Sequence, residues 1–234
     1  MKIKYAVLVI VLFILSLSSL NAQKIANKQF SLLSYDLAIS NDLAEELKDL
    51  DSYVKSIKVY NTPESDKLKA VFIHNLFYTI TDELKHDLSI EILPVNTFLN
   101  KVKYDIYGYP QTSIQQAMRK GNSAYYFKLQ VKLESNTKKL SQEKPDLFKD
   151  LTYKTIVPVV TINITVYSKQ GVLPVDTWNG TYTTEIPLEI NEYLLLGFDN
   201  KDIESPTDEA NPLNNFYYIL HKAIDNLIQD YYTN

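Results

Sequence analysis

The stretch TINITVYSKQGVLPVDTWNG, residues 161–180, predicts the centre of the fold. Its first part alternates between isoleucine or valine and polar residues, a period of two that is typical of a strand with one buried and one solvated face. Residues 169–171 supply a turn, and residues 175–186 return as the antiparallel partner. We therefore predict a β-hairpin in which Trp178, the only tryptophan of the chain, is a packing residue rather than a catalytic or ligand-stacking one.

The flanking segments extend this sheet. Residues 125–135 alternate in the same way, and the apolar runs 28–39 and 89–96 are interpreted as a strand or N-terminal arm and a buried strand. The charged residues 135–154 have no sustained apolar stripe, which predicts an exposed excursion between two strands.

Helices are expected before, between and after these strands in the sequence. Apolar residues recur at helical spacing in residues 41–57. A longer stripe follows Thr62 and Pro63, an N-cap and first-turn proline, as far as residue 88. A capping-box-like start at Thr112 opens a short helix that Gly121 ends. A last helix follows another cap and proline at residues 211–212.

This order predicts an α+β fold in a single domain. The sheet would be mainly antiparallel or mixed, with about four to five strands and with helices packed on one face, because that arrangement buries every apolar stripe. The chain has no cysteine, so its stability must come from a hydrophobic core rather than from disulfides.

The first 22 residues have the pattern of a secretory signal peptide. Two lysines precede an apolar run that ends at Leu20, and Ala22 offers a small residue for cleavage. The run is shorter than the ~20 residues of a membrane-spanning helix. We therefore expect residues 23–234 to be exported without a transmembrane span, to the periplasm, the outer membrane or the outside of a bacterial cell.

Charge and motifs argue against several functions. The formal net charge of −4 lacks the basic surface that nucleic-acid binding requires. The five glycines are isolated, so no phosphate-binding loop is predicted, and the sequence has neither a G-x-S-x-G elbow nor a cysteine nucleophile. We expect no catalytic residue, no metal site and no cofactor.

Two clusters that could suggest a metal site are interpreted otherwise. His74, His86 and His221 lie far apart in sequence and are expected to be surface or packed helix residues. The acidic residues 199–209 lack the glycine and glutamate spacing of an EF-hand and are expected to form a solvated loop.

The loop KYDIYGYPQ is the first candidate for a contact surface. Tyr104, Tyr107 and Tyr109 lie there beside glycine and proline, and tyrosine offers a large apolar area with a polar tip. The alternative is that these three rings pack over the rim of the sheet.

The second half of the chain, residues 58–234, resembles the small periplasmic α/β domain of CsgG, LpoB and the TolB amino-terminal region. The resemblance rests on the order of elements and on Ser123–Tyr125, the turn Tyr167–Gly171 and Trp178. The spacing from Gly171 to Trp178 is longer than in that family, and no lipid-anchoring cysteine is present. The resemblance implies a non-catalytic envelope protein that binds another protein.

The sequence therefore predicts a non-enzymatic, exported cell-envelope protein that acts as a protein-binding or assembly module, with another envelope protein as its partner. The alternative is a hydrolase or small-ligand-binding protein whose site is built from scattered Tyr, Asp and Ser residues. A third possibility is a structural subunit, which would present an exposed sheet edge or a self-complementary face. The oligomeric state is left open.

Overall fold

The computed structural model describes residues 28–57, 67–195 and 215–233. The predicted signal peptide, the helix start at Thr62, the acidic residues 199–209 and the cap at residues 211–212 lie outside these described residues.

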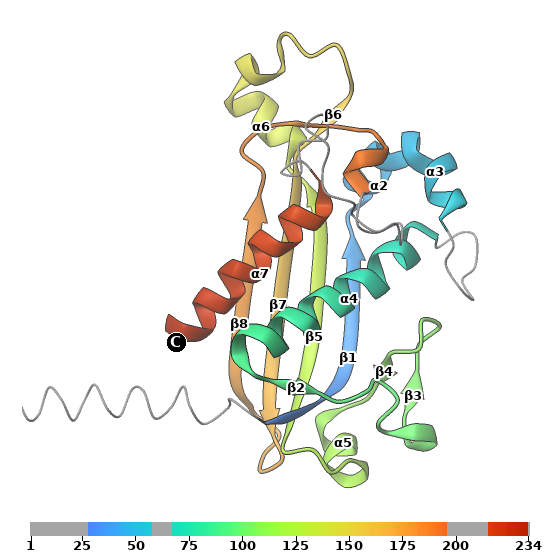
Figure 1. Cartoon of the computed structure of the whole chain (residues 1–234), viewed down its shortest axis with the longest axis vertical. Helices are drawn as coiled ribbons and strands as arrows, with labels where there is room; N and C mark the ends of the chain where they lie inside the picture. The colour runs from blue at the N-terminus through green and yellow to red at the C-terminus, as the bar shows by residue number, and fades with distance from the viewer. Residues whose placement is uncertain (1–27, 58–66, 196–214, 234) are drawn as a thin grey trace, which may run out of the picture.

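The described chain is an α+β domain built on one mixed sheet, as predicted (Figure 1). The long strands are β1 (Gln29–Ile39), β5 (Tyr125–Ser135), β7 (Pro158–Ser168) and β8 (Pro174–Thr183). Strand β5 lies at the centre, parallel to β1 and antiparallel to β7, and β8 pairs antiparallel with β7. Because parallel strands need a long crossover, every element between β1 and β5 belongs to that connection.

Short strands raise the strand count above the expected four to five. Within the described ranges the main sheet has seven strands, because β2 (Glu91–Ile92) and β4 (Pro110–Gln111) pair with β1 and β3 (Lys103–Tyr104) pairs with β4. A separate pair is formed by β6 (Thr155–Ile156) and β9 (Leu188–Glu189). Each has two residues, too few for a period-two pattern to be recognised in the sequence.

Three of these short strands correct particular expectations. The predicted strand over residues 89–96 is reduced to β2, because Ser89 adopts a positive φ of 52° after the preceding helix and Pro94 has no N–H to donate. The tyrosine loop is not irregular but a β3–β4 hairpin.

The hairpin predicted from residues 161–180 is confirmed. Burial along strand β7 alternates as far as Val166, and Ile162, Ile164 and Val166 are completely buried. Their cross-strand partners on β8 include Trp178, opposite Ile164, and Gly180, opposite Ile162. Trp178 is 1% exposed and lies 6.3 Å from Phe30 and 5.1 Å from Tyr231 between ring centroids, so it is a packing residue as predicted.

The two long helices, α4 (Lys67–Leu88) and α7 (Phe216–Thr233), lie on the same face of the sheet (Figure 1). They contact one another through Phe72 and Phe216, whose ring centroids are 5.1 Å apart. Smaller helices complete the fold: α2 (Asn41–Glu46), α3 (Asp51–Ser56), α5 (Ile114–Lys120) and α6 (Thr137–Glu143). The predicted helix over residues 41–57 is thus α2 and α3, joined by a 3₁₀ turn.

The described start of α7 has a side-chain cap. The side chain of Asn215 accepts a hydrogen bond from the Tyr218 backbone N–H at 2.8 Å, so asparagine at 215 caps the described helix. Helix α5 is capped in the same way by Ser113, one residue beyond the predicted Thr112, and the Gly121 N–H closes it onto Ala117.

The opposite face of the sheet is partly covered, which the expectation of helices on one face did not include. A second apolar cluster forms there around α5, and Leu33, Tyr126 and Tyr167 belong to it. Leu33 reaches that face because the β1–β5 register shifts between Leu32 and Ser34, a bulge that leaves Leu32 and Tyr35 in the main core.

Gly180 sets the distance between α7 and the sheet. A Cβ atom there would lie 2.6 Å from the Cβ of Leu227 and still closer to the carbonyl oxygen of Ala223. Helix backbone therefore rests directly on strand backbone at this point. Two α7 side chains also cover the free edge of β8: Asp230 accepts from the Asn179 N–H at 2.8 Å, and Asn226 donates to the Thr181 carbonyl at 2.7 Å.

Substitution of Gly180 should therefore destabilise the protein strongly. Gly180→Ala forces α7 away from β8, and we expect the free energy of unfolding to fall by about 1–3 kcal/mol, the usual cost of overpacking. Chemical denaturation with Trp178 fluorescence as the signal measures this. Gly171→Ala is the matched control: a Cβ there meets nothing within 4 Å, so stability should change by less than about 1 kcal/mol. Equal effects of the two substitutions would contradict the role given to Gly180.

Candidate functional site

The structure places Tyr109 inside the core rather than on a contact surface. It is 3% exposed, and its ring meets Tyr35 edge-on at 4.9 Å between centroids and Phe77 at 5.0 Å. Its hydroxyl is 3.0 Å from Nδ1 of His74. Burial raises the pKa of Tyr109 far above its ordinary value. The expectation that Tyr109 offers an exposed surface is therefore wrong.

Tyr104 and Tyr107 are half-buried, in different surroundings. Tyr107 packs against the main core, 6.4 Å from the His74 ring and with the Lys69 ammonium 5.8 Å from its centroid. Tyr104 packs against the second cluster, on the other face of the sheet. The three tyrosines therefore do not form one surface, and the alternative that they pack over the sheet's rim describes them better.

The turn of the β3–β4 hairpin explains why the rings separate. The Asp105 carboxylate accepts from the backbone N–H groups of Tyr107 and Tyr109, at 2.9 and 2.8 Å. Gly108 adopts a φ of +87°, which glycine tolerates best. This tight turn directs Tyr109 inward to His74.

A groove runs along the outer side of α4. It encloses about 710 Å³ between α4, the segment after β2 and the first turn of α7. Its apolar lining is Phe77, Ile92, Leu93, Pro94, Val95 and Tyr217. Asp82, Glu83 and Lys85 add charge along the same helix, and Tyr78, which is 68% exposed, lies at its border.

The charged groups at this groove give it a net negative character. Two carboxylates face one ammonium, and burial together with Glu83 and Asp82 raises the pKa of the Tyr217 phenol. The Tyr217 phenol therefore stays protonated well above neutral pH. Sequence analysis missed the groove, because its walls come from three segments that are distant in the chain.

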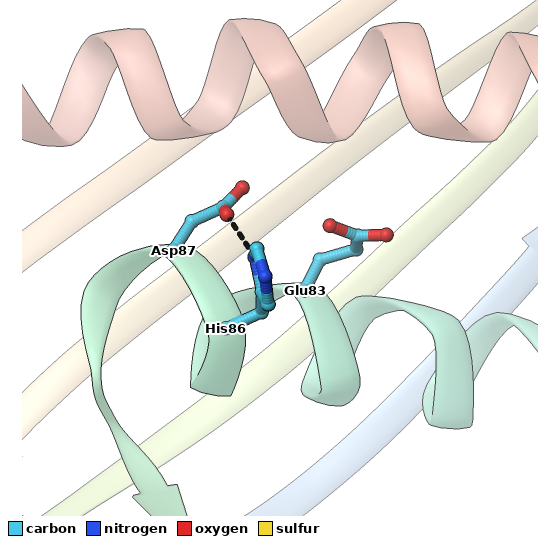
Figure 2. Close-up of side chains that lie close together, drawn as sticks. All are labelled: Glu83, His86 and Asp87. Atoms are coloured by element: carbon cyan, nitrogen blue, oxygen red, sulfur yellow. Dashed lines mark hydrogen bonds and ion pairs between the residues drawn. The ribbon is translucent and has the colours of Figure 1, made fainter.

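A cluster of possible ligand groups lies at the last turn of α4, next to the groove (Figure 2). Oxygen or nitrogen atoms of Glu83, His86 and Asp87 all lie within 4.8 Å of one another. The His86 ring is 2.6 Å from the Asp87 carboxylate, whose hydrogen bond raises the pKa of His86. From α7, Nδ1 of His221 approaches Glu83 Oε1 at 3.4 Å.

The sequence contained one signal for this cluster, the run ELKHD at residues 83–87. Positions three and four residues apart share a helix face, which brings His86 and Asp87 beside Glu83. The contribution of His221 could not be foreseen, because it depends on how α7 lies against α4.

No protein-family model matches the chain, and no curated protein matches its sequence. Solved structures that match the chain include the hypothetical protein CT253 from Chlamydia trachomatis, at 8% identity and a TM-score of 0.41 over 88% of this chain and 99% of that one. The PelC dodecamer from Paraburkholderia phytofirmans matches at 13% identity and a TM-score of 0.28, over 68% of this chain and 71% of that one.

Protein XCC0632 from Xanthomonas campestris, of family DUF330, matches at 11% identity and a TM-score of 0.28, over 90% of this chain and 83% of that one. None of these three is named as a CsgG, LpoB or TolB protein, and the resemblance to that domain stays a prediction. Across the described ranges, no helix is both long and apolar enough to span a membrane.

His74 makes stability depend on pH in a predictable direction. Burial lowers its pKa from 6.5, against a smaller opposing effect of the Asp105 carboxylate. The folded state therefore favours the neutral ring, whose Nδ1 can accept the Tyr109 hydroxyl proton, whereas the protonated ring can only donate. As the pH falls, the unfolded chain takes up the proton before the folded chain does. The contribution of neutral His74 to the free energy of unfolding is therefore complete above pH 6.5 and is lost as the pH falls toward the lowered pKa.

We therefore expect wild type to lose more unfolding free energy than His74→Gln between about pH 7.5 and pH 5. Denaturant titrations at several pH values measure the difference. The protonation of His86, His221 and the carboxylates affects both proteins equally, so it does not contribute to the difference between them. A steeper acid loss in the variant than in wild type would show that the protonated ring is the favoured one.

Proposed function

We propose that this protein is a non-enzymatic binding module of the cell envelope, and that the groove along α4 receives a segment of a partner protein. The observation that carries the proposal is the combination of an open apolar lining with an acidic border. Aromatic side chains supply contact area at low entropic cost, and Tyr78 and Tyr217 provide them here.

The charges of the groove specify the occupant. Asp82 and Glu83 outnumber Lys85, so the complementary segment carries apolar side chains for the lining and lysine or arginine opposite these carboxylates. Export follows from the signal-like first 22 residues and remains part of the proposal. A partner in the same compartment would therefore be another exported protein.

The two alternative functions, a hydrolase and a structural subunit, receive less support from the described residues. The histidines of residues 28–57, 67–195 and 215–233 pair with tyrosine or carboxylate groups, and no hydrogen bond there joins one to a serine. A serine hydrolase is therefore not favoured. Assembly through the β8 edge is opposed by Asp230 and Asn226, which occupy backbone groups that an added strand would need.

Site-specific photocrosslinking in cells tests the groove. A photoreactive residue at Tyr78 or Thr81 should capture one and the same protein, because both positions border the groove. Tyr153 and Tyr193, which are 47% and 61% exposed and lie outside the groove lining, are matched control positions. Asp82→Lys should reduce capture from Tyr78 several-fold by removing the charge complementarity.

Capture of the same species from the control positions, or capture that Asp82→Lys leaves unchanged, would contradict the proposal. A small molecule that copurifies with the protein and protects Tyr78 from reaction would instead favour the ligand-binding alternative.

A further inference from the structure

Three side chains with ligand atoms cluster at the end of α4, and a fourth, His221 of α7, approaches one of them, Glu83. Glu83, His86 and Asp87 occupy one face of its last turns, with their ligand atoms within 4.8 Å of one another. Figure 2 shows the Glu83 and Asp87 carboxylates extending toward the neighbouring helix, with the His86 ring between them. On α7, His221 points at the same Glu83 carboxylate, 3.4 Å from its Oε1.

The position on the helix favours a bound cation. The C-terminal end of α4 carries the negative pole of the helix dipole, where cations are stabilised and carboxylates are not. Asp87 nevertheless lies one residue before the helix ends at Leu88. A metal ion at this point would offset both the carboxylate charges and the helix pole.

The two helices are held in place around the cluster. The Tyr232 hydroxyl donates to the backbone carbonyl of Asp87 at 3.2 Å, which ties the last turn of α7 to the last turn of α4. Upstream, Gly180 fixes α7 against the sheet. The side chains of Glu83, Asp87 and His221 are 31%, 35% and 29% exposed, so they are accessible yet partly ordered by their surroundings.

We propose that Glu83, His86, Asp87 and His221 form a divalent transition-metal site that joins α4 to α7. Two imidazoles with two carboxylates match the nitrogen and oxygen donors and the fourfold coordination that Zn²⁺ adopts in proteins. Ca²⁺ and Mg²⁺ require oxygen donors in larger number, so they fit this donor set poorly. This site revises the expectation of no metal, which was based on the sequence separation of the histidines.

The site overlaps the proposed partner groove at one residue but can be tested separately. Glu83 is common to both, but His86, Asp87 and His221 are not part of the groove lining. Failure of metal binding therefore leaves the groove proposal intact, and failure of crosslinking at Tyr78 leaves the metal proposal intact.

Isothermal titration of the chelator-treated full chain with Zn²⁺ tests the site. We expect saturable binding of one ion per chain and a rise in melting temperature, because an ion that binds only the folded state stabilises it. His86→Ala and Asp87→Asn should each weaken binding at least about tenfold, since even loss of a group that only hydrogen-bonds to a metal ligand has that effect. Both side chains lie at the surface, so these variants should fold.

Asp82→Asn is the matched control. It removes one negative charge from the same helix without removing a ligand atom, and it should leave Zn²⁺ affinity within about threefold of wild type. His221→Gln should weaken binding as His86→Ala does if the site joins two helices. Its melting curve without metal shows whether the substituted chain is folded.

Three results would overturn the proposal. The first is the absence of saturable binding up to about 1 mM Zn²⁺. The second is an equal loss of affinity in Asp82→Asn and Asp87→Asn, which would indicate diffuse attraction. The third is tighter binding of Ca²⁺ or Mg²⁺ than of Zn²⁺. A folded His221→Gln protein with wild-type affinity would overturn the two-helix site.

Discussion

The direct contact between α7 and β8 at Gly180 is the constraint on which the rest of the structure depends. Only a residue without a Cβ lets the helix backbone at Ala223 and Leu227 come this close to the strand. That approach seats Trp178 against Tyr231 and brings Asp230 and Asn226 to the edge of β8. The same placement turns His221 toward Glu83 on α4. A small change at one strand position would therefore alter the core, the sheet edge and the cluster together.

The two sides of helix α4 have different roles. Its inner face supplies core residues such as Phe72, Leu76 and Ile80, which hold it to the sheet. Its outer side presents the groove, and its last turn presents the ligand cluster. Because the inner face anchors the helix firmly, the outer side chains are carried on a rigid element, which suits a binding surface better than a loop would.

The three tyrosines of the β3–β4 hairpin show that residues close together in the sequence need not share a surface. Tyr104, Tyr107 and Tyr109 stand together in the sequence, but a tight turn at Asp105 and Gly108 sends Tyr109 into the core. Tyr104 and Tyr107 pack against different clusters on the two faces of the sheet. Turn geometry and the β1 bulge decide this, and neither has a period that the sequence displays. Of the aromatic side chains now proposed for binding, Tyr217 belongs to the apolar stripe of the last helix and Tyr78 lies outside the stripe of α4, so neither position indicates a binding role in the sequence.

The sequence by itself determined the elements whose burial repeats regularly: the β7–β8 hairpin, strand β5, the apolar stripes of α4 and α7, and the packing role of Trp178. Such patterns are local, because a period of two or 3.6 residues in the apolar positions indicates which face of a strand or helix must be buried. Only the tertiary structure decided what those faces meet. The parallel pairing of β1 with β5, the groove beside Tyr217 and the approach of His221 to Glu83 join residues far apart in the chain. Distances of that kind are fixed by packing between elements, which local periodicity does not encode.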